Sequence, residues 1–289
     1  MKKIIIVTCF CLFAMIYSVW ANETRMETFM AGDYIDDIVN IAVYPHHIAM
    51  YQNNLYGDIT RGVEDYGIII APDIKYGAFA CWQKGIYLGG FNLGYAINFR
   101  KFDIGIFASP VEDHLQYGFG IGRTFFDRRF DLSFLVSDAL NDEWYQFNFR
   151  CTGRKGDYII VPKYVLKQVR EPYEYTRHRF GVMLQRRILN EGFVYFIAEY
   201  DFRQGDISID FTNIYAGLEL ALSRVVMLRL GVFEQFDDGF ETPVWQIEPG
   251  IGLRIREFNL DFHLNQDRLF DKEVTLFNSF GLDLNFGRF

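Results

Sequence analysis

The sequence of 289 residues has little cysteine and proline, and it has no long hydrophobic run after its first twenty residues. Its 7 prolines and 25 glycines exclude a collagen-like chain, and its 4 cysteines exclude a small fold held together by disulfides. A helical membrane protein is also excluded, because a spanning helix needs about 18 consecutive apolar residues. A disordered chain is excluded by the 18% of aromatic residues. The sequence therefore predicts a folded protein with much apolar surface to place.

Positive charge is also scarce. The 29 lysines and arginines are outnumbered by 37 aspartates and glutamates, which gives a net charge of −8. Binding to nucleic acid needs a clustered basic face, so we expect no nucleic-acid partner.

Residues 1–21 have the pattern of a signal peptide. Lys2 and Lys3 precede an apolar stretch, and Val19-Trp20-Ala21 places small residues at the −3 and −1 positions of a cleavage site. The alternative is a retained transmembrane anchor, which the polar residues after Ala21 disfavour. We expect an exported mature chain that begins near Asn22 and carries two cysteines, Cys81 and Cys151. Because the strand pattern places them at opposite ends of the structure, we expect two free, buried thiols.

From about residue 54 onward, apolar residues recur at every second position, which is the pattern of β-strands. The segments are long for soluble strands and suit tilted strands that cross a membrane. Sixteen segments qualify, but the first two are short, so we expect twelve to sixteen strands and favour about fourteen. The segments are 54–60, 66–71, 75–83, 88–99, 102–109, 114–125, 130–138, 143–152, 157–168, 176–187, 192–203, 208–222, 225–236, 243–253, 257–266 and 273–286.

The connections between these segments alternate in charge, from Arg100-Lys101 and Ser223-Arg224 in a basic set to 138–143 and 267–273 in an acidic set. If the strands run up and down in order, each set falls on one rim of a barrel. A soluble Greek-key sandwich has no reason to separate charge in this way. The residues Trp82, Trp144 and Trp245 fall near the acidic rim, where they predict an aromatic girdle at a membrane interface.

The C-terminus resembles the closing strand of bacterial outer-membrane β-barrels, which the barrel-assembly machinery recognises. The residues that carry this resemblance are Gly281, Leu284, Phe286 and the final Phe289. Together with the export signal and the alternation, it predicts an all-β fold: a transmembrane antiparallel up-and-down barrel over residues 54–289, embedded in outer-membrane lipid. A soluble exported β-protein is the alternative.

Residues 22–53 do not follow the strand pattern. With Asp36, Asp37, Asn40 and Pro45, this segment resembles the N-termini of barrels related to long-chain fatty-acid transporters and PorV-type secretion components, although Tyr44-Pro45-His46 replaces their Asn-Pro-Ala step. The resemblance implies a hatch inside or beneath the barrel, and the alternative is a loosely ordered periplasmic extension. Several apolar residues of the segment need burial, which favours the hatch. They are Ile35, Ile38, Val39, Ile41, Val43, Ile48 and Met50.

Catalytic and metal-binding patterns are absent from the sequence. No histidine has a serine two residues further on, the spacing with which a barrel phospholipase activates its hydroxyl. The pair His46-His47 lacks a nearby Cys, Asp or third His in the sequence, so we expect no metal site. We therefore expect no enzyme activity and no cofactor.

Charged residues that alternate with outward apolar ones are the candidates for the lining of the lumen. Because both signs occur, they predict either a packed network of ion pairs or a polar passage. The connections are too short to fold inward as a large constriction loop, so a plugged or narrow barrel is favoured over a general porin. The candidates are Arg150, Glu219, Arg229, Arg254, Asp261, His263 and Asp283.

The function that this pattern favours is passive transport or diffusion of small or hydrophobic solutes across the outer membrane. The alternative is a non-transporting scaffold or an accessory barrel of a secretion system, with another envelope protein as a partner. The sequence names neither a substrate nor a partner.

Overall fold

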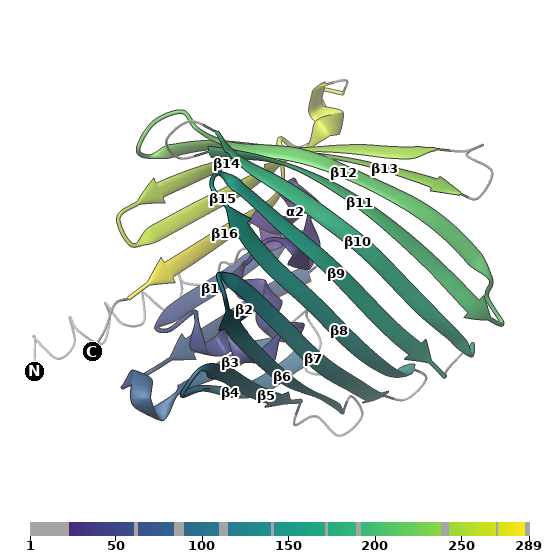
Figure 1. The fold of residues 1–289 in the computed structure, drawn as a ribbon. Coiled ribbons are helices and arrows are strands. Elements are labelled where there is room, and N and C mark those ends of the chain that lie inside the picture. The colour runs from purple at the N-terminus through teal and green to yellow at the C-terminus, as the bar shows by residue number, and fades with distance from the viewer. Residues whose placement is uncertain are drawn as a thin grey trace, which may run out of the picture.

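In a computed structural model, the described residues form a closed barrel of sixteen antiparallel strands (Figure 1). The structure describes residues 23–60, 63–83, 90–109, 115–139, 142–170, 173–188, 192–237, 243–269 and 271–286. The predicted signal peptide, residues 1–21, and the terminal Phe289 lie outside these ranges.

The first strands are short and the middle ones are long. The strands are β1 Asn54–Thr60, β2 Val63–Ile70, β3 Ala78–Gln83, β4 Phe91–Phe99, β5 Phe102–Ala108, β6 Gln116–Phe125, β7 Arg128–Ala139, β8 Asp142–Lys155, β9 Tyr158–Val169, β10 Tyr175–Ile188, β11 Gly192–Gly205, β12 Ile209–Ala221, β13 Val226–Asp237, β14 Val244–Ile255, β15 Phe258–Leu264 and β16 Phe277–Asn285. The helices are α2 Glu23–Phe29 and the 3-10 helices η1 Gly32–Tyr34, η2 Ile38–Ala42, η3 Pro45–Ala49, η4 Ile74–Tyr76 and η7 Gln266–Leu269.

The barrel closes between its first and last strands. Strand β1 pairs with β2 on one side and with β16 on the other, from Asn54 opposite Asn285 to Thr60 opposite Ser279. The prediction of about fourteen strands is therefore wrong, because the two short first segments belong to the wall. A sheet without them would leave the edges of β3 and β16 unpaired, and hydrocarbon offers no water to satisfy those backbone groups.

Each strand pairs with its neighbours in sequence, so successive connections lie at opposite ends of the barrel. We call the end where β1 begins and β16 finishes the terminal rim, and the other end the distal rim. The turns at 100–101, 126–127, 156–157 and 256–257 lie on the terminal rim. The up-and-down order thus confirms that the basic connections share one rim.

The predicted girdle of three tryptophans on the distal rim is wrong for two of them. Trp245 is exposed, but Trp82 is buried against the ring of Phe107, and Trp144 packs toward the same interior core beneath the amine of Lys167. The register explains this difference, because Trp82 lies opposite the inward-facing Gly67 and Asn92.

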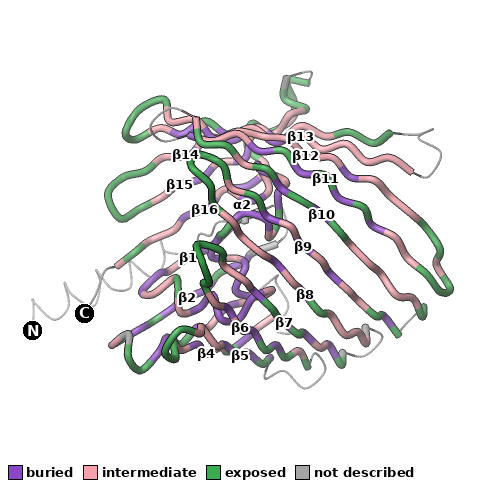
Figure 2. The backbone as a smooth tube through the Cα atoms, in the orientation of Figure 1, coloured by how far each residue is buried: buried purple, intermediate pink, exposed green. Residues whose placement is uncertain are grey.

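Buried and exposed residues alternate along the strands (Figure 2). In β7, Asp131, Ser133 and Ser137 are buried toward the interior, whereas Leu132 and Phe134 are exposed on the outside. The wall is therefore apolar outside and polar inside, the reverse of a soluble domain and the pattern of a transmembrane barrel.

The same alternation places the two cysteines. Cys81 and Cys151 are free, as predicted, but each is half-buried rather than buried. Their neighbours Trp82 and Arg150 are buried toward the interior, so the alternation turns both thiols to the outer face.

Residues 23–53, which we call the inner segment, pack against the inner side of the wall, where they form the purple ribbon inside the barrel in Figure 1. Helix α2 contacts β12–β16 and β1, and η3 contacts β3–β6. Among the residues that the structure describes, no helix has the length and hydrophobicity that crossing a membrane requires. The segment joins β1 at Asn53, whose positive φ of 58° and side-chain bond to the backbone N–H of Ala71 fix the turn into the wall.

The inner segment is buried in two apolar cores. One surrounds Ile38, Ile41 and Ile48 under β1–β5 and β7, and the other surrounds Phe29 and Tyr34 under β9–β11. Each such side chain, when fully buried, contributes about 1.5–3 kcal/mol relative to exposure in water. Burial is thus confirmed for Ile35, Ile38, Ile41 and Ile48, while Val39 and Val43 are half-buried and Met50 is exposed.

Inward-facing glycines make room for this segment. A Cβ atom at Gly105 would overlap the backbone of Pro45 and His46, and one at Gly231 would overlap the backbone of Thr28 and Phe29. The wall therefore has two areas free of side chains, one on β4–β6 for η3 and one on β13 and β14 for α2.

Placing an arginine on the outer face tests which side meets lipid. Phe134 lies in the middle of β7, so Phe134→Arg is expected to lower the free energy of unfolding in lipid vesicles by about 2–4 kcal/mol. The matched control Phe126→Arg lies in a turn on the terminal rim and is expected to cost at most about 1 kcal/mol. Urea titration in vesicles measures both, and equal costs would contradict a lipid-facing outer surface.

Candidate functional site

Three groups of polar side chains join the inner segment to the wall, and they form the candidate site. We call them the Asp131 cluster, the Arg25 cluster and the His263 cluster. All three lie inside the barrel, where the inward positions of neighbouring strands meet residues 24–47.

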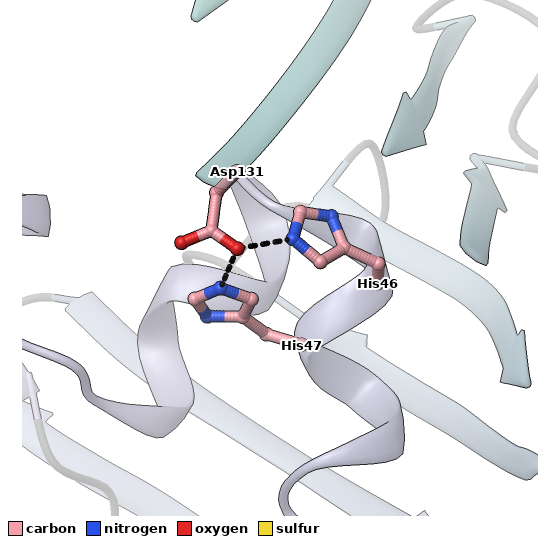
Figure 3. A group of neighbouring side chains, drawn as sticks. All are labelled: His46, His47 and Asp131. Carbon is pink, nitrogen blue, oxygen red and sulfur yellow. Dashed lines mark hydrogen bonds and ion pairs between the residues drawn. The ribbon is translucent and has the colours of Figure 1, made fainter. Parts of the chain in front are cut away.

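The Asp131 cluster consists of Asp131, Arg129, Arg150, His46 and His47 (Figure 3 shows three of them). One oxygen of Asp131 lies 2.8 Å from His46 Nε2 and 2.8 Å from Arg129 Nε, while the other accepts from Arg150 Nη2 at 2.8 Å. His47 Nε2 lies 3.4 Å from the first oxygen. An ionised carboxylate only accepts, so His46 donates through Nε2–H. Two strands and η3 thus meet at one buried carboxylate.

Arg150 extends this cluster along the inner segment. Its guanidinium donates to the backbone oxygen of Asp33 at 2.8 Å and to the carboxylate of Asp36 at 2.5 Å, and it lies over the ring of Tyr44. The side chain is completely buried. A buried guanidinium is tolerated when all its donors are paired, so Arg150 holds η1 and η3 in one arrangement.

Lys163 and Glu199 continue the contacts on β9 and β11. Lys163 Nζ donates to Asp33 at 2.6 Å and lies 4.0 Å from the centre of the Tyr34 ring, and the Tyr34 hydroxyl donates to Glu199 at 3.0 Å. Burial raises the pKa of Asp33, but the charges of Lys163 and Arg179 outweigh it and hold this pKa at about 2. Asp33 is therefore ionised and paired at neutral pH.

His46, His47 and Asp131 could bring three ligand atoms within 4.8 Å of one another, which is the spacing of a metal site. The expectation that no Asp lies near the two histidines is wrong, because Asp131 comes from a distant strand. However, Arg129 and Arg150 already donate to both oxygens of this carboxylate, and their positive charges oppose a divalent cation there. The arrangement is better explained as an ion-pair cluster that holds η3 against the wall.

The histidines of this cluster are neutral at neutral pH. Burial lowers the pKa of His46 to about 4, although its bond to Asp131 acts in the opposite direction, and burial lowers the pKa of His47 as well. Protonation would add positive charge beside Arg129 and Arg150. The cluster therefore favours neutral imidazoles.

The Arg25 cluster joins α2 to the terminal half of the wall. Arg25 lies 2.8 Å from Asp37 within the segment and 3.5 Å from Glu219 of β12. Glu219 also accepts from Arg229, which pairs with Asp261. Burial raises the pKa of Asp37 to about 6, against the lowering effect of Arg25. Beside this cluster, Thr24 donates from its backbone N–H and its hydroxyl to Asp58 of β1.

The His263 cluster joins α2 to the distal half of the wall. Glu27 accepts from the Ser279 hydroxyl at 2.8 Å and lies 3.2 Å from His263 Nδ1, while the other ring nitrogen pairs with Glu248. Ser279 and His263 lie opposite each other in the register. Activation of a serine needs its hydroxyl on the imidazole. Here the hydroxyl bonds to Glu27 and both ring nitrogens face carboxylates, so the pair has no catalytic geometry.

Cavities lie on both sides of α2. The distal cavity, of about 600 Å³, is lined by Glu27 and Met30 of the inner segment and by Tyr215, Phe233, Gln246, Glu248, His263, Asn278 and Ser279 of the wall. The terminal cavity, of about 420 Å³, is lined by Arg154, Asp157, Ile159, Gln185, Arg187, Gly192, Phe193, Glu219, Met227 and Arg254. Arg25 faces a third space of about 130 Å³, which shares Met227 and Arg254 with the terminal cavity. Helix α2 therefore stands between the distal and terminal spaces.

Comparisons with known proteins give the fold. Neither a protein-family model nor a curated protein matches the sequence. A bacterial polysaccharide outer-membrane secretin superposes with a TM-score of 0.55 at 10% identity, over 81% of this chain and 97% of that chain. OmpT, an outer-membrane protein of Vibrio cholerae, superposes with a TM-score of 0.51 at 10% identity, over 80% of this chain and 93% of that chain. This chain has the fold of an outer-membrane β-barrel.

These likenesses confirm the general prediction of an outer-membrane barrel fold. They do not support the narrower resemblance to long-chain fatty-acid transporters and PorV-type barrels, which stays a prediction. At 10% identity the likeness is one of fold alone, so the roles of individual residues come from this barrel's own geometry.

The predicted lumen-lining residues all lie at inward positions, but they do not form one site. Glu219, Arg229 and Asp261 meet in the Arg25 cluster, whereas Arg150 and His263 belong to the other two. Arg254 is exposed near the terminal rim and lines the terminal cavity. Asp283, half-buried, lines the small space beside Arg25.

The residues singled out in the N-terminal segment lie at its contacts with the wall or at its turns. Asp36 pairs with Arg150 and Asp37 with Arg25. Asn40 donates to the backbone oxygen of Ile35 and so closes a turn, and Pro45 begins η3.

In the closing strand, Gly281 is buried opposite Asp58 of β1, and Leu284 is half-buried. The backbone N–H of Phe286 donates to Asn53. Recognition of this strand by assembly machinery stays a prediction.

Several residues of the three clusters were not predicted from the sequence: Asp131, Lys163, Glu199, Glu248 and the charged residues of α2. Asp131 had the same signal as Arg150, because it also alternates with outward apolar residues in its strand. Glu27 and Arg25 had no such signal, since their role depends on where the inner segment docks.

Removing Arg150 tests the Asp131 cluster. Arg150→Met removes the ion-pair partner of Asp36 and one of the two arginines that pair with the buried Asp131, so we expect the free energy of unfolding to fall by about 3–5 kcal/mol. We also expect faster hydrogen exchange of residues 33–47. The control Arg170→Met breaks an exposed pair with Glu143 and is expected to cost at most about 1 kcal/mol. Equal effects of the two variants would contradict a structural role for the cluster.

Acidification is expected to loosen η3. Because the folded pKa of His46 lies below its unfolded value of 6.5, the stability from the neutral ring is complete above pH 6.5 and is lost as the pH falls toward 4. Hydrogen exchange of residues 44–50, corrected for the intrinsic rate, should therefore show less protection at pH 5 than at pH 7. A double variant, His46→Gln with His47→Gln, should lose this pH dependence. If it keeps the dependence, the histidines are not its source.

Proposed function

We propose that this protein is an outer-membrane barrel that allows passive passage of small solutes, and that the inner segment is its hatch. The observation that carries this proposal is that α2 borders the distal cavity of about 600 Å³ through Glu27 and, through Arg25, the small space that adjoins the terminal cavity of about 420 Å³. A barrel of sixteen strands is wide enough for an aqueous channel unless something fills it. In this barrel the filling is a separate segment rather than wall side chains alone.

The polar lining favours small polar solutes over hydrophobic ones. The distal cavity presents Glu27 and Glu248. The terminal cavity presents three arginines and two carboxylates, namely Arg154, Arg187, Arg254, Asp157 and Glu219. An apolar solute would displace the water that hydrates these charged groups and would offer them no hydrogen bonds in its place. A charged lining instead suits a polar solute, which can form hydrogen bonds with the lining groups as water does.

The barrel is proposed to lie in the outer membrane with its terminal rim toward the periplasm, since an even number of strands returns the chain to the side from which it entered. We propose no catalytic activity and no resident cofactor. Two observations support this view. The Ser279 hydroxyl bonds to Glu27 while His263 pairs with Glu248, and arginine guanidinium groups donate to both oxygens of Asp131.

A second candidate is a scaffold barrel that conducts nothing and engages another envelope protein. The completely buried Arg150 and the paired charges around it favour this alternative, because they describe a packed interior. Conductance separates the two candidates.

A reversible crosslink tests the hatch. A Cβ atom at Gly250 would lie 2.9 Å from Thr28 Cβ, so a small shift of α2 brings Thr28→Cys and Gly250→Cys within disulfide range. In a background with Cys81 and Cys151 replaced by Ser, we expect the lowest conductance in planar bilayers when the pair is oxidised. Reduction should restore the wild-type level, and each single cysteine variant serves as a control.

Deletion of residues 23–51 is the second test of the hatch. It retains Asn53, whose side chain accepts from the backbone N–H of Ala71 and so fixes the start of β1. We expect higher conductance than in the full chain, because the space between the cavities opens. The same conductance in the deleted and full-length barrels would contradict the hatch. A folded barrel that conducts in neither form would favour the scaffold.

A further inference from the structure

The distal cavity has the size of a ligand site. Its volume of about 600 Å³ lies within the range of 300–1,000 Å³ that is typical of small-molecule sites, and barrel mouths are common places for them. The inner segment forms its floor through Glu27 of α2 and Met30, which follows the helix, and strands β12–β16 form its walls.

The charge of this cavity is negative. Two carboxylates, Glu27 and Glu248, flank the single imidazole of His263, and no lysine or arginine is among the described lining residues. Even with the imidazole protonated, one negative charge remains. The potential therefore repels anions and attracts cations.

Glu27 offers an open acceptor to this space. Its Oε2 atom receives the contacts from Ser279 and His263, whereas no described residue donates to Oε1. The side chain is 37% exposed although it stands inside the barrel. Glu248, in contrast, uses both oxygens, one toward Gln246 and one toward His263. An ammonium group of a ligand would therefore pair with Glu27.

Part of the cavity's lining is aromatic and apolar. The rings of Tyr215 and Phe233 have centroids 4.8 Å apart and an interplanar angle of 33°, and Met30 adds an adaptable apolar surface. Such a surface packs against an apolar or aromatic ligand body and attracts a cation near the ring faces.

We propose that the distal cavity is a binding site for a small organic cation, an amine with an apolar or aromatic body, whose ammonium group pairs with Glu27 and whose body packs on Tyr215 and Phe233. The site shares no lining residue with the terminal cavity, and binding there does not depend on passage through the barrel. Binding and conduction are therefore tested by separate measurements, and a failure of one proposal leaves the other standing.

Calorimetry on the full chain in lipid nanodiscs tests this inference with 2-phenylethylamine, which is protonated at pH 7. Its neutral and anionic analogues are 2-phenylethanol and 3-phenylpropionate, and empty nanodiscs correct for partition into lipid. We expect the alcohol to bind at least tenfold more weakly than the amine and the acid not to bind. Glu27→Gln should weaken binding of the amine at least tenfold, since it removes the open charge.

The matched control is Glu257→Gln, the same change in a turn on the terminal rim, which should leave the affinity unchanged. Because Glu27→Gln could also disturb α2, Tyr215→Leu provides a second variant on the wall, and it too should weaken binding. The proposal is overturned if the amine does not bind, if alcohol and amine bind equally, or if both Glu27→Gln and Tyr215→Leu bind like the control.

Discussion

The structure depends on the pairing of every backbone N–H and C=O group around a closed sheet. In hydrocarbon no water satisfies an unpaired edge, so even the seven residues of β1 are kept between β2 and β16. Closure with sixteen strands then fixes the width of the interior. An interior this wide is not filled by wall side chains, and residues 23–53 occupy part of it.

The polarity of the wall determines how this segment is held. Because the outer face takes the apolar residues, the inner face offers mainly polar ones, with apolar patches where the two cores form. Burial of Ile41 and Phe29 supplies hydrophobic stabilisation, while Arg150 and Asp131 impose one arrangement. Buried ion pairs add little net stability, but a misplaced segment would leave them unpaired. In this barrel we interpret them as fixing position more than as adding strength.

Much of the fold was predictable from alternation alone, and so were the inward positions of Arg150, Glu219, Arg229, Asp261 and His263. Alternation could not give the strand number, because a short strand is recognised only when its partner is known, as β1 is by β16. It also failed for Trp82, which interior packing holds inside although its position along the strand suits a girdle. The ion pairs could not be predicted from the sequence, since their members are distant in it, as Asp131 and His46 are 85 residues apart.

The sequence by itself determined that one face of each strand is apolar and the other polar, because the side-chain period of a strand is two. It also determined that residues 22–53 differ from the wall, through their apolar content and lack of alternation. Only the tertiary structure decided which inward charges meet, and that α2 borders the distal cavity on one side and the small space beside Arg25 on the other. The physical reason is that register and docking depend on contacts between distant residues, which local pattern does not contain.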